Sequence, residues 1–190
     1  MKDHPSYSST ETPTSSHLWR NILPQIGNLG HALAPDLIGM GGRSGKPPIN
    51  YGFLDTARYL DAWFDQMELD DVVLVGHDWG RGRLHWTGLP ATPRSRPRCG
   101  LLRNDPSSDD LGRTLPGRGT GTVEALRDSD TGETKVLDEN FFLEIALHRT
   151  VLGEMTETDA EAYRSPYPSR ESRRPLLEWP RSFPHRRNSR

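Results

Sequence analysis

The sequence predicts an α/β protein, and two neighbouring segments carry that prediction. Apolar residues recur at three- and four-residue spacing between Phe53 and Met67, which is the period of an amphipathic helix. The apolar run Val72-Val73-Leu74-Val75 follows directly and is typical of a central parallel strand covered on both faces. With a short strand candidate before them, these segments have the strand–helix–strand order of a βαβ crossover.

Composition limits the class of protein. The formal net charge of -2 gives no reason to expect nucleic acid or an anionic membrane as the main partner. Only 33% of the 190 residues are hydrophobic, and 16 Pro with 18 Gly predict a core over part of the chain rather than all of it. The start of the chain lacks the apolar segment of a secretory signal, and no apolar run is long enough to span a bilayer. With a single cysteine, Cys99, and no internal disulfide, a cytoplasmic protein is expected.

The first part of the chain has the pattern of an ordinary α/β protein once its polar start is passed. Residues 1–12 are polar, lack periodicity and are expected to be disordered. Residues 31–34 are a candidate for a short buried strand, and residues 39–48, rich in Gly and Pro, predict a loop. The helix that follows should turn one apolar face toward the core. That face consists of Phe53, Ala57, Leu60, Phe64 and Met67.

The character of the chain changes at Arg81. Residues 81–120 contain eight Arg, five Pro and six Gly, but no Val, Ile, Phe, Tyr, Met or Lys. Neither helical nor strand periodicity is present, so we expect residues 81–122 to be irregular and without regular elements.

Order is expected to resume at residue 123. Residues 138–147 predict a helix with Asp138 as its N-cap. Thr156 and Asp159 resemble a capping box in front of a short helix that continues to Tyr163.

The motif with the clearest chemistry is Gly76-His77-Asp78-Trp79-Gly80, directly after the apolar run. It has the small-x-nucleophile-x-small form of a nucleophile elbow, a tight strand-to-helix turn that presents its central side chain above the sheet. Backbone N–H groups at such a helix start favour negative charge. An Asp there can attack carbon and form an ester. The alternative is that Asp78 merely caps a helix after a glycine turn.

Several further segments, in the same order along the chain, make the sequence resemble the haloalkane dehalogenases. The matching residues are 13–21, 34–41, 44, 46–47, 71–80, 137–147, 155–168, 173–175 and 179–181. The resemblance implies a partial α/β-hydrolase core with a mostly parallel sheet at 13–80 and part of a helical cap at 123–184. It leaves residues 81–122 as an irregular segment and 185–190 as a tail.

The resemblance also implies a mechanism. Asp78 would be the catalytic nucleophile that displaces halide from a halogenated alkane, and Trp79 would donate its indole N–H to the leaving halide. A histidine, oriented by an acid, would activate water to hydrolyse the ester. No cofactor and no metal are implied, and Cys99 has no His or Cys at ligand spacing.

The chain departs from the family pattern in three places. Thr12 stands where the family has an Asn that is its second halide donor, and Glu11 adds a negative charge beside it. No strand that ends in the catalytic acid is evident near residues 98–105, and no histidine lies in the context of the catalytic base. We therefore expect impaired turnover and attribute the pattern to a shortened copy with a shifted reading frame after Gly80, which the coding DNA would test.

Other functions remain open at this point. Epoxide hydrolases of the same fold also carry an Asp-centred elbow, and a panel of haloalkanes and epoxides would separate the two. The Arg excess of residues 81–118 could attract nucleic acid, but Trp86 is its only aromatic residue, so no stacking platform is evident. Residues 41–46 resemble a phosphate loop but lack its first Gly and its Ser/Thr, and an ordinary loop is expected. The chain could also be a remnant without activity.

Overall fold

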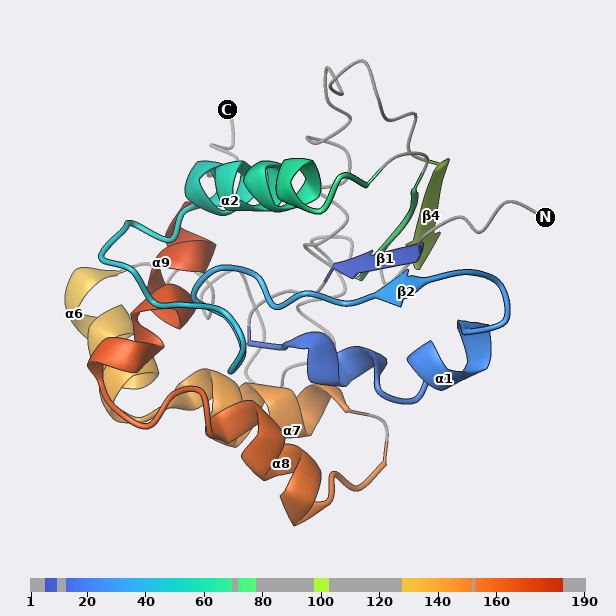
Figure 1. The fold of residues 1–190 in the computed structure, drawn as a ribbon. Helices are drawn as coiled ribbons and strands as arrows, with labels where there is room; N and C mark the ends of the chain where they lie inside the picture. Colours follow the sequence, from blue (N-terminus) through green and yellow to red (C-terminus); the bar gives the residue numbers. More distant parts are fainter. Residues whose placement is uncertain are drawn as a thin grey trace, which may run out of the picture.

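A four-stranded parallel sheet organises the first half of the molecule (Figure 1). The computed structural model describes residues 6–9, 13–69, 72–77, 98–102, 128–151 and 153–182. The strands lie in the order β2-β1-β3-β4, so β1 and β3 are internal and β2 and β4 are at the edges. Their bounds are β1 (Ser6–Ser9), β2 (Ala32–Leu33), β3 (Val73–His77) and β4 (Arg98–Leu102).

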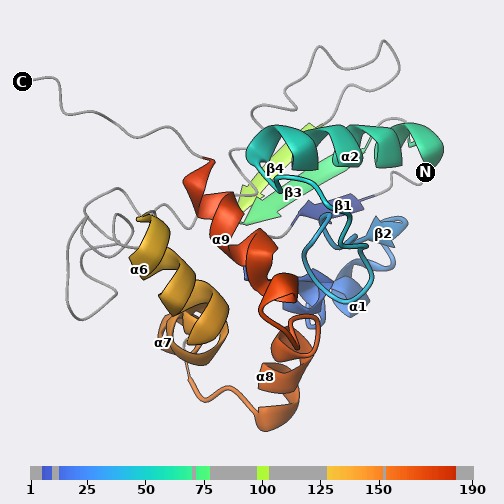
Figure 2. The same ribbon diagram turned by 90° about the vertical axis from the view of Figure 1, so that its left-hand side faces the viewer.

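The strand order reverses at β1. The chain passes from β1 to β2 on one side and then crosses through α2 (Phe53–Gln66) to β3 on the other side. This crossover is the predicted strand–helix–strand unit. Figures 1 and 2 show α2 along one face of the sheet, whereas α1 (Leu23–Ile26) lies on the opposite side. Open parallel sheets bind ligands beyond the carboxyl ends of the strands at such a reversal.

Helix α2 confirms most of the predicted apolar face. Ala57 and Leu60 are buried, and Phe53 and Phe64 are half-buried against the core. Met67 is the exception, because the helix ends at Gln66 and Met67, as the C-cap, is 45% exposed. The spacing of apolar residues therefore predicted the buried face of α2 correctly, but it extended that face one residue beyond the end of the helix.

The strands differ from the prediction in three ways. β1 lies within residues 1–12, which the sequence predicts to be disordered, yet it pairs in parallel with both β2 and β3. β3 is internal, as expected, but its burial alternates, with Leu74 buried and Val73 and Val75 half-buried. β2 is shorter than the predicted strand and only half-buried, since it lies at the edge of the sheet.

Residues 98–102 correct the expectation that the Arg-rich segment has no regular element. They form β4, which pairs in parallel with all five residues of β3, from Val73 with Arg98 to His77 with Leu102. Backbone hydrogen bonding to an existing strand requires no alternation of side-chain type, so composition alone gave no signal for it.

The second half of the described chain is helical. Figure 2 shows these helices gathered beyond the sheet, with α9 nearest to it. Their bounds are α6 (Ser129–Glu133), η2 (Thr134–Asp138), η3 (Phe142–Ala146), α7 (Leu147–Thr150), α8 (Glu157–Arg164), η4 (Glu171–Arg173) and α9 (Arg174–Arg181). We call this region the cap.

Two predictions about the cap have different outcomes. Thr156 caps α8 as expected, since its hydroxyl oxygen accepts a hydrogen bond from the N–H of Asp159 at 3.1 Å. Asp138, by contrast, is the last residue of the π-helix η2 rather than an N-cap. The break lies at Asn140, whose φ of 54° separates η2 from the next helical segment, and its carbonyl accepts the first bonds of that segment.

One hydrophobic cluster joins the sheet region to the cap. Leu74 of β3 and Leu60 of α2 belong to the same cluster as Leu176 and Leu177 of α9, and the latter two are 0% and 2% exposed. Burial of this kind is the main favourable term in folding. None of the described helices is long and apolar enough to cross a membrane.

Candidate active site

The candidate site lies where the carboxyl ends of β1, β3 and β4 meet. Gly76 of β3 is paired with Ser9 of β1 on one side and with Leu101 of β4 on the other. β3 then ends at His77, the residue before Asp78 in the sequence. The predicted nucleophile Asp78 and the predicted halide donor Trp79 both lie outside the described residues, as do Glu11 and Thr12.

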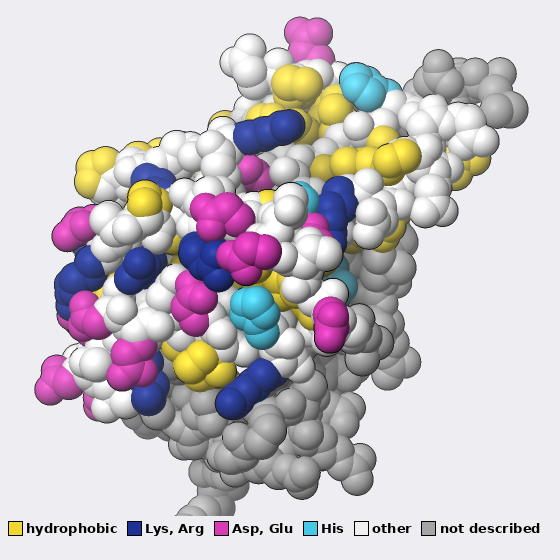
Figure 3. All heavy atoms as spheres, turned by 90° about the horizontal axis from the view of Figure 1, so that it is seen from below, with side chains coloured by type: hydrophobic (Ala, Val, Ile, Leu, Met, Phe, Trp, Pro, Cys, Tyr) yellow, Lys and Arg dark blue, Asp and Glu magenta, His cyan; other side chains and the backbone are white. Residues whose placement is uncertain are grey.

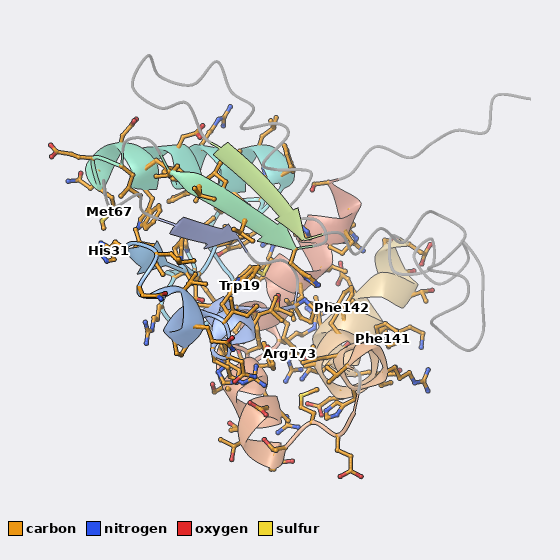
Figure 4. All side chains as sticks on the ribbon, turned by 90° about the vertical axis from the view of Figure 1, so that its right-hand side faces the viewer. Trp19, His31, Met67, Phe141, Phe142 and Arg173 are labelled. Atoms are coloured by element: carbon orange, nitrogen blue, oxygen red, sulfur yellow. The ribbon has the colours of Figure 1, made fainter. Side chains whose placement is uncertain are left out.

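The η1 segment (Ser16–Trp19) is a turn that packs beside this edge of the sheet. It follows the buried residues Thr14 and Ser15. The Ser15 hydroxyl oxygen accepts from the N–H of His17 and caps the turn. Trp19 is only 1% exposed, and in Figure 4 it lies between the sheet and the cap helices. Its indole N–H has no hydrogen-bond partner among the residues that the structure describes.

The loop after β2 holds this turn in place. One carboxylate oxygen of Asp36 accepts from the N–H of Ser16 at 2.7 Å, and the other accepts from the N–H of Arg43 at 2.9 Å. Gly41, at φ 67°, lies so close that an added Cβ would be 2.3 Å from the Asp36 carboxyl. A left-handed, side-chain-free residue is therefore required at this position.

Lys46 explains why the phosphate-loop pattern is not a phosphate site. Its amine donates to the carbonyl of Gly39 at 2.9 Å and lies 4.3 Å from the centre of the Tyr167 ring. Desolvation lowers the pKa of the amine to about 8, although the Asp36 carboxylate acts in the opposite direction. The lysine is thus a contact between loop and cap, as the interpretation of an ordinary loop requires.

The cap side of the region is built on Tyr167 and Arg173. Tyr167 is 1% exposed, its hydroxyl accepts from the N–H of Gly41 at 3.3 Å, and burial raises its pKa above the ordinary value. Arg173 donates to the carbonyls of Leu137 and Tyr167. Figure 4 shows Arg173 below the sheet, on the side of Phe141 and Phe142.

Phe141, Phe142 and Met155 are partly buried apolar side chains of the cap that pack against the core cluster. Phe141 is the N-cap of the π-helix η3 and Phe142 is its first residue, and π-helical turns are often found at functional sites. No group of three or more His, Cys, Asp or Glu side chains able to hold a metal ion exists within the described ranges.

The structure also contains a contact that the sequence did not reveal. Asp159, predicted only as part of a capping box, accepts a hydrogen bond from His17 and forms an ion pair with Arg20 of the η1 region, each at 2.9 Å. His17 and Asp159 are 142 residues apart, so no local pattern could have linked them.

Comparisons with known proteins agree on the fold and on a similarity to haloalkane dehalogenases. A sequence profile described as the alpha/beta hydrolase fold matches residues 12–81. The chain is 40% identical over 177 residues to a haloalkane dehalogenase from Mesorhizobium japonicum, a match that covers 90% of this chain and 55% of that protein. It is also 33% identical over 180 residues to the coelenterazine h 2-monooxygenase of Renilla reniformis, of which it covers 54%.

The solved structures extend this likeness to the fold. A loop variant of a haloalkane dehalogenase from Bradyrhizobium elkanii matches with a TM-score of 0.82 and 33% identity, and the match covers 95% of this chain and 62% of that one. The chain spans a little more than half the length of the curated relatives it matches. Sequence and structure together show the α/β-hydrolase fold, and the chain is similar to haloalkane dehalogenases over nearly all of its length.

Proposed function

We propose that the chain is a haloalkane dehalogenase-like hydrolase in which Asp78 attacks a halogenated alkane. The observation that carries the proposal is that β3 ends at His77, next to the strand where the strand order reverses, and that Asp78 is the next residue in the sequence. A nucleophile elbow requires this position, and open parallel sheets bind their ligands there.

The reaction begins with a displacement at carbon. A carboxylate oxygen of Asp78 forms a bond to the sp³ carbon as the carbon–halogen bond breaks, and halide leaves with the bonding electron pair. The product is an alkyl ester of Asp78. The indole N–H of Trp79 donates a hydrogen bond to the departing halide, which stabilises the developing charge.

The second step, hydrolysis of the ester, is the one for which the chain has no recognised base. Water must add to the ester carbonyl, and a base must take its proton, before alcohol is released and the Asp78 carboxylate is restored. No histidine of the chain lies in the sequence context of the family's base. Of the described histidines, His17 is engaged by Asp159, His31 and His148 are exposed, and His77 is the last residue of β3, directly before Asp78 in the sequence. We therefore propose that ester formation outpaces ester hydrolysis.

Halide release from 1,2-dibromoethane tests both steps in one experiment. The purified chain is expected to release about one bromide per chain and then to slow, while mass spectrometry finds a bromoethyl group on the peptide that contains Asp78. The Asp78→Asn variant keeps the shape of the side chain but removes the nucleophile, and it should show neither signal.

The other outcomes are equally informative. Sustained release that disappears in Asp78→Asn would confirm the nucleophile and show that an unassigned base completes the cycle. A soluble, folded chain that releases no bromide and carries no adduct would contradict the proposal and favour an inactive remnant. Turnover of epoxides but not haloalkanes would assign the chain to epoxide hydrolysis instead. The monooxygenase relative shows why the reaction must be measured rather than taken from family membership.

A further inference from the structure

Asp159 of helix α8 gathers hydrogen-bond donors from two separate parts of the chain. Its carboxylate accepts hydrogen bonds from His17 Nε2 at 2.9 Å and from the Thr156 hydroxyl at 2.8 Å, and it forms an ion pair with Arg20 Nε at 2.9 Å. A carboxylate can only accept, so His17 donates through Nε2. The ring of His17 also meets the ring of Tyr163, on the same helix, edge to face at 5.2 Å. The η1 turn is thus bound to the cap by charge, hydrogen bonding and ring contact.

The η1 turn, the loop after β2 and the cap are joined pairwise, so that their contacts form a closed ring of three segments. The contact of Asp159 with the η1 turn is one of the three. The η1 turn is bound to the loop after β2, because Ser16 N–H donates to Asp36 at 2.7 Å. The same loop is bound to the cap, because Gly41 N–H donates to the Tyr167 hydroxyl at 3.3 Å. The cap returns to the η1 turn through Asp159. Each of the three segments is therefore held by the other two.

We propose that Asp159 is a positioning residue that closes this ring and fixes the segment 13–19 between the cap and the sheet. Residue 12, immediately before that segment, is where the family resemblance puts the second halide donor. The bearing of Asp159 on halide therefore rests on the proposed function, whereas its hold on the segment does not.

Charge around Asp159 separates it from the other acids of its helix. Figure 3 shows acidic and basic side chains interleaved over the face that carries α8. Glu157 and Glu161 both bind Arg164, which lies on α8 itself. Asp159 instead faces His17 and Arg20 of the η1 region. Hydrogen bonds from His17 and then from the Thr156 hydroxyl, together with the charge of Arg20, hold the pKa of Asp159 below its ordinary value. Glu161 is consequently a matched control on the same helix.

Hydrogen exchange measured by mass spectrometry on the full chain tests the proposal without substrate. The N–H groups of Leu18, Arg20 and Ile22 donate to backbone carbonyls within the η1 turn and report on its opening. In Asp159→Asn, exchange over residues 14–22 is expected to accelerate about fivefold, since the loss of an exposed charged contact changes local opening by that order. In Glu161→Gln it should be unchanged.

Two further variants separate positioning from local helix stability. Thr156→Ala removes the cap of α8 but keeps the carboxylate, so it should accelerate exchange in α8 alone. Asp159→Glu keeps the charge and should restore slow exchange in the turn. If Asp159→Asn lowers the stability of the whole chain, His17→Phe breaks the same contact from the other side and should accelerate exchange over 14–22 only.

Exchange over 14–22 that stays unchanged in both Asp159→Asn and His17→Phe would overturn the proposal. Failure of bromide release in the Asp78 experiment would leave this result standing, because exchange needs no chemistry. In a preparation that does turn over, Asp159→Asn should raise KM more than it lowers kcat, which a variant that merely loses folded protein would not do.

Discussion

Two of the contacts that join the cap to the sheet region have opposite character. Tyr167 is 1% exposed and places an aromatic ring and a hydroxyl against the loop after β2. Asp159 is partly exposed and meets the η1 turn through a carboxylate, an imidazole and a guanidinium. Buried aromatic area contributes much more to folding than exposed ion pairs do. The comparison indicates that Tyr167 holds the cap in place, whereas Asp159 sets how the η1 turn is oriented beneath it.

The largest effect is expected at Tyr167. Tyr167→Ala removes a fully buried ring and leaves a cavity, which should lower the free energy of unfolding by about 3–5 kcal/mol. Tyr167→Phe keeps the ring and loses only the bonds of the hydroxyl to Gly41 N–H and Met40 Sδ, at a cost of about 1 kcal/mol. Urea denaturation of both variants measures the difference. A cost below that of Tyr167→Phe for the alanine variant would break the comparison.

The loop between these contacts should be nearly as sensitive. Gly41→Ala would place a Cβ 2.3 Å from the Asp36 carboxyl at a φ of 67°, and we expect a loss of about 2 kcal/mol from strain. Asp36 would also have to release Ser16 or Arg43. The adjacent Gly42 has nothing within 4 Å of an added Cβ, so Gly42→Ala is the control. Equal stability of the two variants would show that the loop yields without cost.

The sequence predicted the elements whose signal is local. The period of α2, the apolar run of β3 and the Thr156 cap each depend on residues within a few positions of one another, and all three are present. The errors have physical causes. β4 arises from pairing with β3, which composition does not encode, and Asp138 precedes a break at Asn140 that requires a left-handed backbone. Sequence signals for a helix start locate the first residue only approximately, so a residue shortly before the true start can be mistaken for the N-cap.

The sequence predicts a site directly after β3, but it gives no sign of the residues that surround this position. Parallel strand order and the elbow motif together locate the region at the end of β3, and the strand order is as the fold class requires. The residues that frame it come from distant segments. Ser16 with Asp36 are 20 positions apart, and Gly41 with Tyr167 are 126 apart. Such pairs form only when the core cluster brings sheet and cap together.

A smaller effect is expected from the ion pairs that lie within the cap. Arg164 binds Glu144 at 2.9 Å, and this hydrogen bond is the main reason that the pKa of Glu144 is below its ordinary value of 4.5. A lowered pKa stabilises the fold above pH 4.5, and that contribution is lost as the pH falls through the lower, folded value. In Glu144→Gln, the free energy of unfolding should therefore fall less steeply as the pH is lowered below about 4.5. At pH 7 it should cost no more than about 0.5 kcal/mol, because the pair is exposed. Thermal unfolding from pH 7 to pH 3 measures both, and an unchanged acid limb would show that other carboxyls dominate.

The smallest effect is one of reactivity at the edge of the Tyr167 contact. The chain has three lysines, Lys2, Lys46 and Lys135. Much of the Lys46 side chain is exposed, yet its amine lies against the Tyr167 ring, and desolvation lowers its pKa to about 8. Lys135 instead faces Glu139 at 3.5 Å.

At pH 8 we expect an amine-reactive ester, added in limiting amount, to acylate Lys46 roughly tenfold faster than Lys135. This ratio is smaller than the lowered pKa alone implies, because the hydrogen bond from Lys46 to Gly39 must break first. Denaturant should remove the preference. Equal labelling of Lys46 and Lys135 in the folded chain would mean that water reaches the Lys46 amine freely. The Tyr167 ring would then not shield this lysine from solvent.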